Sequence, residues 1–238
     1  MIDFAICCVA FGDEHIDEFN QLTESLYNVK SDLNIYIYTD NGERINDSRV
    51  NVIESDLKWN FNLKKEPIKV ALLKHDTILF MDTDMYVKKD LNFNILNDFT
   101  EDGLYLTRTP HKIFKYKEGE TISIHNMLHK TKYGNYVKTL VNEYGDLAFT
   151  EEQFFILKIS NKEKKNDFYN VWDMIYENTK DLDCHKDSIF EEGLNIYLSC
   201  ILSNTTLHEI KTSMKILYNN FVHYGNDFKK IEKTITII

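Results

Sequence analysis

Hydrophobic and polar positions follow two alternating periods along the first half of the chain. Four short apolar runs are expected to be strands, at residues 4–11, 33–38, 50–53 and 78–81, and the first and the last have the composition of buried strands. Between the first two runs, apolar residues recur at helical spacing after Asp13 and Glu14, acids that suit a helix N-terminus. A second helix is expected from about Pro67 to Lys74. This order predicts an α/β fold with a Rossmann-like, mostly parallel twisted sheet flanked by helices.

The second half of the chain has less regular patterning. Residues 110–138 are rich in His, Lys and Tyr and show no clean period. Thr150 and Gln153 have the spacing of a capping box, and Glu151 and Glu152 favour a first helical turn, so we expect a helix to begin at Thr150. No Gly/Ser linker or repeat divides the sequence, and a single domain over residues 1–238 is expected.

Charge and composition narrow the function classes. The net charge of −10 over 238 residues argues against nucleic-acid binding, which needs a basic face. The N-terminus has no basic region, and its apolar run ends at Phe11, too short for a signal peptide or a membrane span, so a cytoplasmic location is expected. The four cysteines have neither disulfide nor metal spacing and are expected to be reduced core residues.

Two carboxylates follow the apolar run at residues 78–81. Asp82 and Asp84 are two positions apart, so in an extended segment their side chains share one face and can converge on one cation. In open α/β sheets, ligands bind at the carboxyl ends of the strands, where these acids are expected. The pattern therefore predicts a metal site.

The segment ILFMDTDMYV at residues 78–87 resembles the DxD motif of nucleotide-sugar-dependent glycosyltransferases of the GT-A fold. Haloacid-dehalogenase phosphatases share part of the pattern, but their motif lies on the first strand and has Thr or Val where this chain has Tyr86. Two later segments resemble family 8 retaining glycosyltransferases. Glu152-Gln153 is similar to the family's acid-Gln pair. FVHYGNDFK at 221–229 is similar to its His-x-x-Gly-x-x-Lys-Pro-Trp segment, although Gly225 is one residue early and Pro-Trp is absent.

The resemblance implies a role for each half of the chain and for particular site residues. Residues 1–107 would form the nucleotide-sugar-binding half, and residues 108–238 a small acceptor-side lobe with the C-terminal metal and diphosphate segment. The cation, Mn²⁺ with Mg²⁺ as the alternative, would be held by Asp84 and His223, with Asp82 contributing to metal or ribose. Other implied residues are the donor-binding Ala10, Phe11, Asp40, Lys69, Gly225 and Lys229, and the sugar-facing Glu152 and Gln153.

Geometry adds to the resemblance at Lys69. A helix that runs back against the strand that follows it has its N-terminal turn near that strand's carboxyl end. Lys69 is therefore expected on the same edge as Asp82, where it would contact the nucleotide.

The implied reaction is metal-dependent transfer from a nucleotide diphosphate sugar to a hydroxyl of a glycan or other acceptor, and the resemblance points to a UDP-sugar as the donor. Retention is favoured; for inversion, Glu151 or Glu152 is the candidate base. A sugar nucleotidyltransferase or another metal-dependent phosphoryl-transfer enzyme is one alternative, but the acidic Gly12-Asp13-Glu14 loop argues against it. A catalytically degenerate relative that binds a glycan or a partner is the other.

The C-terminal tail, residues 231–238, ends on β-branched residues and is expected to be an edge strand. A dimer contact and a weak peripheral membrane contact, assisted by nearby lysines, are the alternatives.

Overall fold

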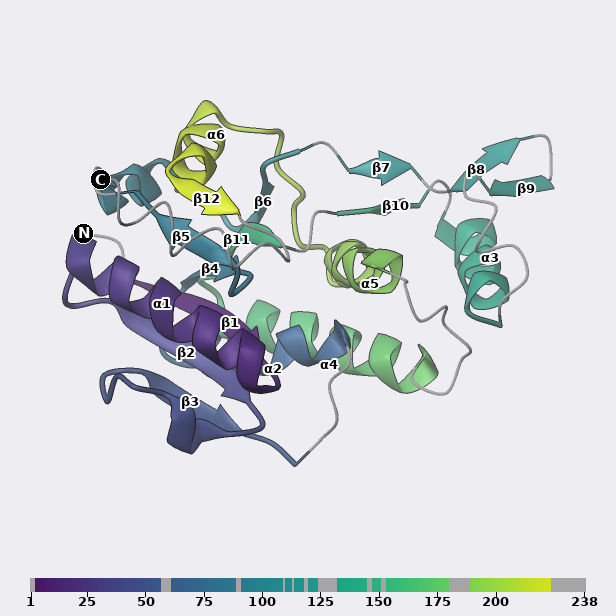
Figure 1. Ribbon diagram of the computed structural model, residues 1–238. Coiled ribbons are helices and arrows are strands. Elements are labelled where there is room, and N and C mark those ends of the chain that lie inside the picture. The colour runs from purple at the N-terminus through teal and green to yellow at the C-terminus, as the bar shows by residue number, and fades with distance from the viewer. Residues whose placement is uncertain are drawn as a thin grey trace.

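A six-stranded sheet forms the centre of the computed structural model, which describes residues 3–56, 61–88, 91–108, 110–112, 114–117, 120–123, 132–144, 147–150, 153–179 and 189–223 (Figure 1). The strand order is β3-β2-β1-β4-β11-β6. The strands are β1 (Phe4–Ala10), β2 (Asn34–Thr39), β3 (Asn51–Glu54), β4 (Thr77–Met81), β6 (Gly103–Leu106) and β11 (Phe154–Lys158). The first four in sequence are parallel neighbours. The predicted α/β fold with a mostly parallel sheet is confirmed.

Helices cover both faces of this sheet. On one face lie α1 (Asp13–Val29) and α6 (Thr212–Asn219), and on the other α2 (Lys65–Leu72), α4 (Lys162–Thr179) and α5 (Ile189–Leu202). α3 (Lys132–Tyr144) packs against α4 and α5 instead, and the 3₁₀ turns are η1 (Gly42–Arg44), η2 (Phe61–Lys64) and η3 (Phe93–Asp98). Alternate β1 side chains point to opposite faces. Ile6 and Cys8 pack in the core that contains α1, whereas Ala5 and Cys7 pack in the core that contains α2 and α4. β1 is therefore buried on both faces, whereas the edge strand β3 is partly exposed.

The described residues that follow Thr150 form a strand from Phe154, and the prediction of a helix there is wrong. β11 lies between β4 and β6 and is antiparallel to both. Four consecutive side chains of β11, from Phe154 to Leu157, are at most 1% exposed. A helix on the surface of a sheet would leave one face in solvent, whereas a central strand buries both faces and so needs an unbroken apolar run. Tertiary burial therefore overrides the local capping signal.

Three pairs of short strands complete the described structure. They are β5 (Met85–Val87) with β12 (Phe221–His223), β7 (His111–Lys112) with β10 (Ala148–Phe149), and the hairpin of β8 (Phe114–Lys117) with β9 (Glu120–Ser123). Figure 1 shows β8, β9 and α3 together at the end of the molecule far from β3. Over the described parts of the chain, no helix is both long and apolar enough to cross a membrane.

Candidate functional site

The carboxyl ends of β1 and β2 form one part of the candidate site. Because these strands are parallel, Ala10 at the end of β1 is paired with Thr39 at the end of β2. Asp40 follows β2, and its carboxylate accepts hydrogen bonds from the Gly12 backbone N–H at 3.0 and 3.2 Å. Gly12 has φ of +80°, a conformation that favours glycine. The predicted donor-binding residues Ala10, Phe11 and Asp40 thus lie at one sheet edge.

Asp82 and Asp84 occupy different local structures. Asp82 directly follows β4, and its N–H donates to the Gln153 backbone oxygen at 2.9 Å. Residues 83 and 84 form a turn between β4 and β5. The extended geometry that predicts a shared face for the two carboxylates therefore ends at Asp82, because a turn rotates the next side chains away from the strand alternation. The turn itself lies at the carboxyl end of β4, where the sequence predicted the site.

The backbone of His223 lies beside this turn. β12 pairs antiparallel with β5, and His223 is the pairing partner of Met85, the residue after Asp84. Figure 1 shows these two strands side by side next to the end of β4. The structure thus brings together the chain segments that contain Asp82, Asp84, Gln153 and His223.

Lys64 is the lysine in contact with Asp82. Its Nζ lies 2.9 Å from Asp82 Oδ1, and the two side chains are 6% and 25% exposed. The ammonium also lies 5.0 Å from the centroid of the Phe80 ring. A buried lysine is stable when an opposite charge is close, so the pair balances two charges at the edge of the core. Sequence reasoning missed Lys64 because it started the helix at Pro67, whereas α2 begins at Lys65.

Lys69 lies on α2 but points elsewhere. Its Nζ is 3.1 Å from Asp173 Oδ2 on α4, and Lys65 contacts the same carboxylate. Each residue of a helix advances 1.5 Å along its axis, so Lys69 is more than one turn beyond the sheet edge that Lys64 occupies. Contact with Asp82 therefore belongs to Lys64, and a role for Lys69 in donor binding stays a prediction.

A buried carboxylate from α1 reaches the turn from the other face of the sheet. Glu18 is 5% exposed. Its Oε2 accepts hydrogen bonds from Thr83 Oγ1 at 3.1 Å and from His15 Nδ1 at 3.0 Å. The bond to Glu18 is the main cause of a raised pKa at His15; burial opposes it, and the charges of Glu18, Glu14 and Asp84 add to it. The available sequence signal was an acid four residues before Leu22, on the apolar stripe of α1.

Four residues with predicted roles lie outside the described residues: Glu151, Glu152, Gly225 and Lys229. Their roles stay predictions, as does the structure of the tail. Among the residues that the structure describes, no three His, Cys, Asp or Glu side chains form a group suited to hold a metal ion. The cation set of Asp82, Asp84 and His223 therefore also stays a prediction.

The described cysteines do not contribute a nucleophile. Cys7, Cys8 and Cys200 are free and buried. Burial raises the pKa of each thiol, and at Cys8 the charge of Asp82 adds to the effect. Since the thiolate is the reactive form, these residues remain inert thiols.

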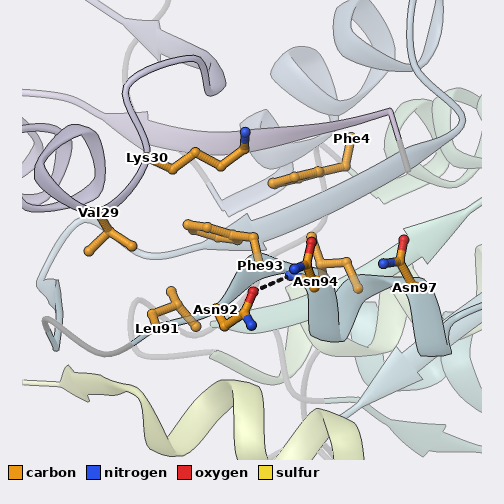
Figure 2. A pocket seen from close by; sticks show the side chains of 9 residues that line it. Phe4, Val29, Lys30, Leu91, Asn92, Phe93, Asn94 and Asn97 are labelled. Carbon is orange, nitrogen blue, oxygen red and sulfur yellow. Dashed lines mark hydrogen bonds between the residues drawn. The ribbon is translucent and has the colours of Figure 1, made fainter. Parts of the chain in front are cut away.

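A pocket of about 210 Å³ lies at the opposite end of the central strands, beside Phe4 at the start of β1. Figure 2 shows side chains from the start of β1, the end of α1 and the segment through η3 around it. The Phe4 and Phe93 rings are stacked with centroids 5.4 Å apart, and the Asn92 side chain accepts a hydrogen bond from the Asn94 N–H. Because Phe4 and Ala10 are opposite ends of β1, this pocket is separate from the candidate site.

Replacing Lys64 by Met tests the Lys64–Asp82 pair. The free energy of unfolding should fall by about 1–3 kcal/mol, because the mostly buried Asp82 carboxylate loses this counter-charge. Chemical denaturation followed by circular dichroism measures the change. In the matched control Lys69→Met, Asp173 keeps Lys65, and a loss below about 1 kcal/mol is expected. Equal losses in both variants would contradict a special role for Lys64.

Comparison with known proteins gives structural matches only. No protein-family model and no curated protein sequence matches the chain. The galactosyltransferase LgtC, in complex with donor and acceptor sugar analogs, is 12% identical with a TM-score of 0.45, over 82% of this chain and 70% of LgtC. The bifunctional glycosyltransferase WbbM, in its apo form, is 9% identical with a TM-score of 0.49, over 94% of this chain and 46% of WbbM. The solved structures that this chain is similar to thus include two glycosyltransferases.

Proposed function

We propose that this protein is a metal-dependent glycosyltransferase that transfers a sugar from a nucleotide diphosphate sugar, preferably a UDP-sugar, to a hydroxyl of a glycan or other acceptor. The observation that supports the proposal most is the meeting of three segments at one sheet edge. The Asp82–Asp84 turn, Gln153 before β11 and His223 at the end of β12 are distant in sequence and adjacent in the fold. Each of these segments carries a motif that resembles the glycosyltransferases.

The chemistry of the predicted ligands suits a hard or borderline divalent cation. Carboxylate and imidazole groups are good ligands for Mn²⁺, and carboxylates also suit Mg²⁺. Asp84 and His223 are the proposed principal ligands, as the resemblance implies, and Asp82, whose carboxylate contacts Lys64, would contribute to the metal or the ribose. A bound cation would supply positive charge to the departing diphosphate.

The remaining proposed roles belong to the protein's own side chains. Lys64 contacts Asp82 of the Asp-x-Asp motif, and we assign to it a contact with the nucleotide of the kind that the sequence predicted for Lys69. An ammonium that is 6% exposed acts on an anion with less screening than one in water.

The acid-Gln pair is proposed to face the donor sugar. The Gln153 backbone oxygen is bonded to the Asp82 N–H, which places this segment beside the motif. Glu152 and Gln153 would then orient the sugar or stabilise its oxocarbenium-like character, with retention as the favoured outcome.

We also propose a cytoplasmic location for the protein.

Calorimetric titration of UDP tests the proposal. Binding in the presence of Mn²⁺ and its loss in excess chelator are expected, because the cation neutralises the diphosphate in an acidic protein. A panel of UDP-sugars, assayed for release of UDP, then identifies the donor. Circular dichroism checks that the protein is folded. A folded protein that does not bind UDP in the presence of Mn²⁺ would contradict the proposal.

A further inference from the structure

The carboxylate of Glu18 is buried, which is energetically unfavourable because the group loses most of its hydration. Glu18 lies on α1 next to Phe19, and Ile16, Phe19 and Leu22 of the same helix are all fully buried. An ionised carboxylate with 5% exposure loses most of its hydration, and an apolar side chain would pack at this position without that cost.

The partners of Glu18 lie at the candidate site. Thr83, whose hydroxyl donates to Glu18, is the central residue of the Asp82-Thr83-Asp84 turn and is 6% exposed. The same helix also contacts the far end of β5, where the Val87 N–H donates to Ser25 Oγ at 3.3 Å. α1 therefore holds the segment from Thr83 to Val87 at both ends.

The second partner of Glu18 restrains the carboxylate. His15 Nδ1 donates to the same Oε2 atom that accepts from Thr83. Two donors on one oxygen leave the carboxylate little freedom to rotate away from the turn. The imidazole is 58% exposed, so it connects this buried pair to solvent at the sheet edge.

We propose that Glu18 is a positioning residue that, through the Thr83 hydroxyl, holds the Asp82-Thr83-Asp84 turn in the conformation that binds the divalent cation. The inference rests on the proposed function, since it assigns a support to that same site. Groups that orient ligands from outside a metal site contribute strongly to affinity, although they never touch the ion.

Glu18→Met and Thr83→Val remove the two ends of the hydrogen bond while they keep similar side-chain shapes. Each variant of the full chain should bind Mn²⁺ alone roughly 10- to 100-fold more weakly, as measured by electron paramagnetic resonance of the free ion. The double variant should bind Mn²⁺ no more weakly than the single variant with the lower affinity, because both substitutions remove the same hydrogen bond. UDP titration in Mn²⁺ should show the same order of affinities.

Conservative variants separate positioning from mere structural support. Glu18→Gln keeps an acceptor and Thr83→Ser keeps the hydroxyl, so both should retain Mn²⁺ affinity within a few fold of the wild type. Glu24→Gln removes an exposed carboxylate from the same helix and should leave affinity unchanged. Glu18→Met leaves the buried Thr83 hydroxyl without its acceptor and should unfold somewhat below the wild-type temperature, whereas the double variant with Thr83→Val has no such unpaired donor and should unfold nearer to it.

Wild-type affinity in both Glu18→Met and Thr83→Val would overturn the inference and leave the proposed function intact. A lower unfolding temperature in these variants with unchanged Mn²⁺ binding would assign Glu18 a structural role alone, which also overturns it. Absence of both Mn²⁺ and UDP binding in the wild type would overturn the proposed function, and this inference with it.

Discussion

Asp84→Ala is expected to abolish Mn²⁺-dependent UDP binding while the protein stays folded. Asp84 is a proposed direct ligand, so the loss should exceed the roughly 10- to 100-fold effect typical of groups outside the ligand shell. The residue lies in a turn after β4 and is not part of the apolar core, so the unfolding temperature should change little. Calorimetry with UDP and Mn²⁺, together with thermal unfolding, measures both properties.

Asp167→Ala is a matched control for this variant. Asp167 is an exposed carboxylate on α4, and its removal changes the net charge by the same amount as Asp84→Ala. UDP binding should be the same as in the wild type. Binding that persists unchanged in Asp84→Ala would sink the site assignment, whereas equal losses in both variants would point to the overall charge of the protein.

Phe155→Ala is expected to lower the free energy of unfolding by about 3–5 kcal/mol, the range for a large aromatic side chain in a core. Phe155 is 1% exposed, and its ring is stacked on Phe80 of β4 with centroids 5.1 Å apart and an interplanar angle of 12°. The substitution removes a ring from the contact between two central strands. Denaturant titration followed by circular dichroism gives the value.

Two comparisons sharpen the Phe155 test. Phe155→Leu keeps most of the apolar volume and should cost less than the alanine variant. Tyr144 is a 44% exposed aromatic residue on α3, and Tyr144→Ala should change stability by no more than about 0.5 kcal/mol. A loss below about 1 kcal/mol in Phe155→Ala would be incompatible with a central position for β11.

The sequence predicted the parallel part of the sheet for a clear physical reason. β1, β2 and β4 are short apolar runs buried on both faces, and burial on both faces requires such runs, whereas β3 is a half-exposed edge strand. The same reasoning located Asp82 and Asp84 after β4. The identity of the segment after Thr150 was not predictable in this way, because Thr150, Gln153 and the acids between them satisfy a local helix signal as well.

The local pattern of apolar and polar residues by itself determined the α/β class, the parallel strands and the position of the Asp-x-Asp turn, because each depends on residues close together in the chain. Tertiary structure decided the rest. It inserted β11 antiparallel beside β4, paired Lys64 with Asp82 and joined Glu18 to Thr83. These features are contacts between residues distant in sequence, and their energies depend on burial and partners that no local pattern contains.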